Sequence, residues 1–98
     1  MAPQPHLHWK NLDELESSLR EFQRMYAADP AQRRALREKV IETKDRARFA
    51  SHNPKVAPDK RAQKAEMVRW MLVWLDDPEL FPTWVSLRRQ SIAREERS

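Results

Sequence analysis

The sequence predicts an all-α protein, a compact bundle of about four helices, and three observations support this. Glycine is absent, which removes the residue that tight hairpins and left-handed turns prefer. Good helix formers such as Ala, Leu, Arg, Lys and Glu dominate, and β-branched residues are scarce. Apolar residues also recur at helical spacing. The 98 residues are expected to form one helical domain, with residues 1–8 as a flexible arm and 94–98 as a frayed tail.

The first helix is expected over residues 11–28. Asn11 is a good N-cap, and Glu14 follows at the spacing of a capping box. Trp9, just before the cap, is placed to fold back onto the apolar side of the helix. That side is a single stripe with spacings of three and four residues, formed by Leu12, Leu15, Leu19, Phe22 and Tyr26.

The second helix is expected over residues 30–50. Asp29 is a good N-cap, and Pro30 suits the first helical position because no hydrogen bond is lost there. Pro54 disfavours helix in the residue before it, so a nine-residue, proline-containing loop is expected over residues 51–59. The predicted core line of this helix is Leu36, Val40, Thr43 and Ala47.

The third helix, expected over residues 59–75, carries the stretch MVRWMLVWL, in which eight of nine residues are apolar. This stretch is about half the length of a membrane span, so no membrane association is expected. A helix that is apolar nearly all round is typical of a central, buried position. The alternative is that Trp70 and Trp74 stay exposed to dock a partner, which could be a second copy. One expected core face consists of Val68, Met71, Leu72 and Leu75.

The last helix is expected over residues 82–93, after a short turn. Asp77 and Pro78 form a cap followed by proline, and Pro82 prevents a continuous helix through the turn. The side chains expected to face inward are Phe81, Trp84, Val85 and Ile92.

Positive charge is concentrated in the middle of the chain. Residues 32–64 hold eleven Lys and Arg against four Asp and Glu, whereas the flanking segments are slightly acidic. Arg and Lys can flank a core line as a solvated face, can bind nucleic acid, or can bind an acidic protein. Four cations of the second helix fall within about 60° on a helical wheel, and four more follow it. The predicted polyanion-binding residues are Arg33, Arg37, Lys44, Arg48, Lys55, Lys60, Arg61 and Lys64.

Catalytic and metal-binding patterns are weak. His6 and His8 form an H-x-H pair, but cysteine is absent and His52 is the only other histidine. Without glycine, neither a nucleophile elbow nor a phosphate-binding loop is expected. The sequence therefore predicts no enzyme, no metal and no cofactor.

Two functions remain as hypotheses. The first is a protein-interaction or assembly module that binds another protein or itself as a homodimer. The second is a nucleic-acid-binding accessory protein that uses the basic face of residues 33–64. The absence of cysteine and of an apolar export segment favours a cytoplasmic location for either.

Overall fold

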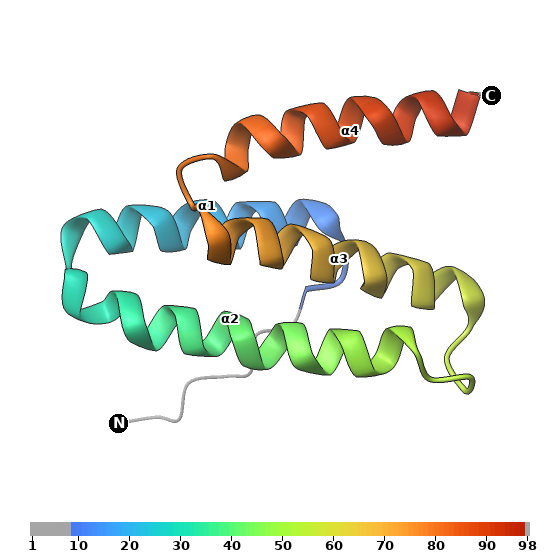
Figure 1. Cartoon of the computed structure of the whole chain (residues 1–98), viewed down its shortest axis with the longest axis horizontal. Helices are drawn as coiled ribbons and strands as arrows, with labels where there is room; N and C mark the ends of the chain where they lie inside the picture. Colours follow the sequence, from blue (N-terminus) through green and yellow to red (C-terminus); the bar gives the residue numbers. More distant parts are fainter. Residues whose placement is uncertain (1–8, 98) are drawn as a thin grey trace.

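Side-chain caps define the first two helices of the computed structural model, which describes residues 9–97. Helix α1 (Leu12–Ala28) begins where Asn11 Oδ1 accepts a hydrogen bond from the Glu14 backbone N–H at 2.9 Å. The Glu14 carboxylate accepts from the Lys10 N–H at 2.7 Å, one residue before the cap. Helix α2 (Pro30–Ser51) begins after Asp29, whose carboxylate accepts from the backbone N–H of the second helical residue at 3.0 Å. A single residue separates the two helices, and Figure 1 shows that they run antiparallel.

The other two helices are longer than the sequence suggested. Helix α3 (Pro58–Asp76) starts at a proline that needs no N–H partner, so the connection from α2 is residues 52–57 rather than 51–59. Helix α4 (Phe81–Arg97) includes Pro82 in its first turn, where a missing N–H costs nothing. The expected end at residue 93 and the frayed tail are corrected, because residues 94–97 are helical. They contain no helix breaker.

Helix α3 lies at the centre of the molecule. Figure 1 shows α2 along one side of α3 and α4 along the other, with α1 behind, and α1 packs against both α2 and α3. The core combines Trp9 with apolar residues from all four helices. Its members are Trp9, Leu15, Leu19, Leu36, Val40, Ala47, Met67, Trp70, Met71, Trp74, Phe81 and Val85.

The apolar nonamer forms the centre of the core, but its buried face differs from the expected one. Met67, Trp70, Met71 and Trp74 are buried, whereas Leu72 is 47% exposed. The docking alternative for Trp70 and Trp74 is wrong for this conformation, because neither indole has any exposed surface. No helix among the described residues is both long and apolar enough to cross a membrane.

Aromatic contacts attach α4 to α3. The Trp70 ring lies edge-on to Phe81 and to Trp84, with ring centroids 6.4 and 6.1 Å apart. Close by, Arg88 donates two hydrogen bonds to the Glu66 carboxylate, at 2.7 and 2.8 Å. The Trp70 indole N–H donates to the same carboxylate at 2.8 Å. Glu66 thus links the central indole to α4.

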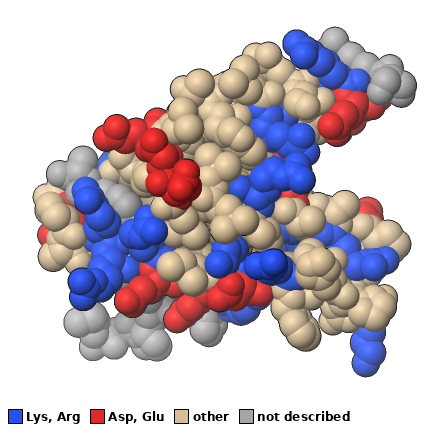
Figure 2. Space-filling model, viewed as in Figure 1, with Lys and Arg blue, Asp and Glu red and all other residues tan. Residues whose placement is uncertain are grey.

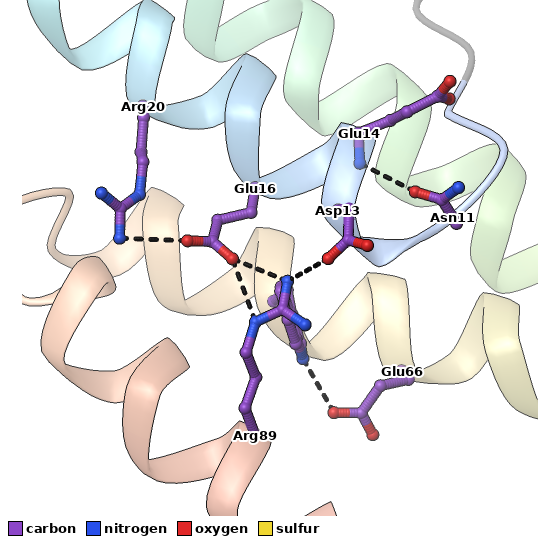
Figure 3. Close-up of polar contacts among 8 residues, drawn as sticks. Asn11, Asp13, Glu14, Glu16, Arg20, Glu66 and Arg89 are labelled. Atoms are coloured by element: carbon purple, nitrogen blue, oxygen red, sulfur yellow. Dashed lines mark hydrogen bonds and ion pairs between the residues drawn. The ribbon is translucent and has the colours of Figure 1, made fainter.

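Arg89 attaches α4 to α1. Figure 3 shows its guanidinium reaching between Asp13 and Glu16, each of which it contacts at 2.7 Å. Glu16 also pairs with Arg20 at 3.0 Å. The same guanidinium lies 5.1 Å from the centroid of the Trp70 ring, within the range of a cation–π interaction. Helix α4 is therefore held by polar contacts on both sides of its aromatic seam.

Candidate functional site

The carboxylate with a shifted pKa belongs to helix packing. The pKa of Glu66 lies below its ordinary value of 4.5, chiefly because Arg88 donates hydrogen bonds to it, and burial opposes this shift. The pKa values of Arg88 and Arg89 are raised by their hydrogen bonds to carboxylates. Because both partners of each pair are engaged in joining helices, these groups have a structural role.

Metal ligands do not cluster in the part of the chain that is described. Residues 9–97 contain no group of three or more His, Asp or Glu side chains arranged to hold an ion. The H-x-H pair, His6 and His8, lies outside the described residues.

The side-by-side packing of α2 and α3 brings the predicted cations together. Arg37 Nη1 donates a hydrogen bond of 2.7 Å to the Leu75 carbonyl near the end of α3. Since the two helices are antiparallel, residues one turn along α2 lie level with residues one turn back along α3 (Figure 1). Ile41 is therefore level with Leu72, and Arg48 lies near the level of Lys64.

One surface combines these residues, and we name it the basic face. On a helical wheel its α2 members occupy the sector next to α3, and its α3 members occupy the sector next to α2. All of them are exposed or half-buried. The basic face consists of Arg34, Arg37, Ile41, Lys44, Arg48, Arg61, Lys64 and Leu72.

Figure 2 looks onto the α2–α3 side of the molecule and shows how charge is distributed there. Lys and Arg form an interrupted band across α2 and α3, with Asp and Glu along part of its lower border and a second group of Asp and Glu above its left part. On a helical wheel of α2, Glu38 and Asp45 fall within about 60° of Ile41, so they border the basic face on its α2 side. The surface is thus basic along the helix seam and mixed at its edge.

Arg37 and Lys44, both predicted polyanion-binding residues, are already engaged within the protein. Arg37 uses one guanidinium nitrogen on the Leu75 carbonyl. The Lys44 side chain is only 17% exposed, and its Nζ lies 3.2 Å from Asp45. Both cations are therefore less available to bind an external ligand than the sequence alone implies.

The other predicted residues occupy different places. Arg33 and Arg48 are exposed on α2, and Arg61 and Lys64 are half-buried on α3. The remaining two are also exposed, Lys55 in the connection between α2 and α3 and Lys60 in the first turn of α3. The structure thus places most of the eight along one seam, with two at its end.

A shallow pocket of about 410 Å³ opens at the start of α2. Three arginines and Ile41 contribute to its lining, which offers positive charge next to apolar surface. The lining residues are Pro30, Arg33, Arg34, Arg37, Glu38 and Ile41. Arg34 and Ile41 were missed by the sequence reasoning. The available signal for Ile41 was that it falls about 130° from the centre of the core line, on the side of the cations.

Comparisons with known proteins add no information on function. No protein-family model, no curated protein and no solved structure matches the chain.

Proposed function

We propose that the protein is a protein-interaction module that binds a partner protein through the basic face. The observation that carries this proposal is the exposure of two large apolar side chains in the middle of the face. Ile41 is 37% exposed and Leu72 is 47% exposed, although the chain has a well-filled core beneath them. Exposed apolar groups rimmed by polar ones are typical of docking surfaces.

The same surface supports nucleic-acid binding less well. Phosphate contacts draw their affinity from free cations, and here Arg37 and Lys44 already have partners inside the protein. A nucleic acid whose phosphates contact only the arginines would leave Ile41 and Leu72 exposed to water. The absence of cysteine fits the cytoplasmic setting that we propose for this interaction.

Site-directed photo-crosslinking in living cells tests the proposal. A photoreactive phenylalanine analogue replaces Leu72, and the same analogue replaces Ala35 as a matched control. Ala35 is also exposed, but lies on the opposite side of α2 from the basic face. We expect a discrete protein adduct from position 72 and none from position 35.

The adduct also separates the two kinds of partner. An adduct of twice the mass of the chain, with dimer on a sizing column, identifies self-association, and any other discrete mass identifies a different protein. Equal adducts from both positions, or none from either, would count against a docking role for the basic face.

A further inference from the structure

We propose that the partner segment is an acidic amphipathic helix that lies along α2 and α3 on the basic face. This inference rests on the proposed function and adds the chemistry of the partner. It follows from the order of groups along the surface: cations, then two apolar side chains, then cations again.

The apolar groups define the centre of the proposed contact. Ile41 and Leu72 come from different helices, and the antiparallel register inferred from the hydrogen bond between Arg37 and the Leu75 carbonyl puts them at about the same level. An approaching helix can cover both with apolar residues at i and i+4 on one of its faces. These two residues are about 6 Å apart along the helix axis, so they would sit on either side of the level that Ile41 and Leu72 share, and each would contact both. Helices that dock in this way present their apolar face to the receptor.

The cations define the ends of the contact. Along α2, Arg34 precedes Ile41 by seven residues and Arg48 follows it by seven, which places them about 10 Å to either side along the helix axis. Both are exposed. A helix of about 14 residues, roughly 21 Å long, spans this distance. Carboxylates two turns before and two turns after its apolar centre would meet the two arginines.

Charge complementarity selects an acidic partner over a basic or neutral one. The cations of the basic face outnumber the carboxylates near them, which are Glu38 and Asp45 on α2, Asp76 one turn after Leu72 on α3, and Asp77 and Glu79, which line a pocket with Arg37. A basic helix would be repelled along the seam, and a neutral one would leave the exposed arginines without partners.

Synthetic peptides test this inference directly. The probe is a fluorescein-labelled peptide of about 19 residues with two central leucines at i and i+4, glutamates one and two turns to each side, and alanine elsewhere. One matched peptide has serine for both leucines, and another has lysine for the glutamates. Fluorescence anisotropy gives the dissociation constant of each, and a labelled DNA duplex and single strand are titrated in parallel.

Protein variants locate the binding surface. Ile41→Ser and Leu72→Ser remove the apolar centre, and Arg48→Gln removes one end. Phe49→Ser is the matched control, because Phe49 is the most exposed large apolar residue described on α2 but lies outside the basic face. Far-UV circular dichroism establishes that every variant remains helical.

We expect the acidic leucine peptide to bind, and the serine peptide to bind about tenfold more weakly. Ile41→Ser and Leu72→Ser should each weaken binding about five- to tenfold, and Phe49→Ser should leave it unchanged. Arg48→Gln should weaken binding two- to fivefold at low salt, with a smaller effect as salt rises.

Three results would overturn the inference: equal binding of the serine peptide, tighter binding of the lysine peptide, or an effect of Phe49→Ser as large as that of Leu72→Ser. Binding of DNA without binding of the acidic peptide would also overturn it and would favour a polyanion ligand. The photo-crosslink remains an independent test. An adduct at position 72 with a segment that is not acidic and helical would retain the interaction function and reject the partner class.

Discussion

Replacement of Glu66 by glutamine should destabilise the protein, because this carboxylate joins α3 to α4. It accepts two hydrogen bonds from Arg88 and one from the Trp70 indole, all between 2.7 and 2.8 Å. A longer contact of 3.3 Å comes from Arg69. Glutamine has nearly the same shape but presents an N–H₂ group to the guanidinium, so Glu66→Gln tests the charge with little change in packing.

The size of the effect follows from the burial of the pair. The Glu66 and Arg88 side chains are 15% and 21% exposed, so the pair is intermediate between a surface pair and a buried one. A surface pair contributes up to about 1 kcal/mol, and breaking a buried pair costs about 3–5 kcal/mol. Glutamine keeps an acceptor for the indole, so we expect a loss of about 2 kcal/mol in the free energy of unfolding. For a domain of this length, that lowers Tm by about 10 °C.

The same carboxylate makes stability depend on pH. Because the pKa of Glu66 is lowered in the folded protein, its contribution is present above the unfolded-state pKa, near 4.5. The contribution is lost as pH falls through the lower, folded-state pKa. The difference between wild type and Glu66→Gln should therefore be largest near neutral pH and shrink in acid.

Urea unfolding followed by far-UV circular dichroism, at about pH 7 and about pH 3, measures both effects. Glu42→Gln is the matched control, because Glu42 is exposed on α2 and shares the same change of charge. Equal unfolding midpoints for the two variants at neutral pH would refute the stabilising role of the pair. A difference that does not shrink in acid would refute its assignment to the Glu66 charge.

Three further substitutions test other parts of the structure. Arg89→Met removes the contacts with Asp13 and Glu16, so it should lower stability by about 0.5–1 kcal/mol and speed amide hydrogen exchange in the second half of α4. Asn11→Ala removes the α1 cap and should lower the free energy of unfolding by about 1 kcal/mol in urea titrations. Phe49→Ser should change it by less than about 0.5 kcal/mol, because that side chain is 75% exposed and outside the core.

Helices with one apolar stripe were the most predictable elements. All four residues of the α2 core line are buried, and Trp9 packs into the core beside α1 as expected. The caps at Asn11 and Asp29 are also confirmed. A surface helix needs only one buried side, so its periodicity reports that side directly.

The candidate site was predictable only in part. The helical wheel placed four cations of α2 on one side of the helix, next to the core line. A side next to the core line lies close to a neighbouring helix, and in the structure that neighbour is α3. The hydrogen bond from Arg37 to the Leu75 carbonyl requires the register of α2 against α3, which no local pattern encodes. Ile41 stood outside the core line, and its proposed role depends on the register of α2 against α3 and on the exposure of Leu72.

The misassigned face of α3 explains why an apolar centre exists on the basic face at all. A helix that is apolar on all sides gives no contrast for periodicity to detect, so its neighbours decide which residues are buried. Here α1, α2 and α4 cover three sides of α3. The fourth side stays open, and it carries Leu72 beside the seam with α2. The apolar residues of α3 therefore form the core on three sides and reach the basic face on the fourth. A partner that supplies both apolar groups and carboxylates would complete the packing around α3.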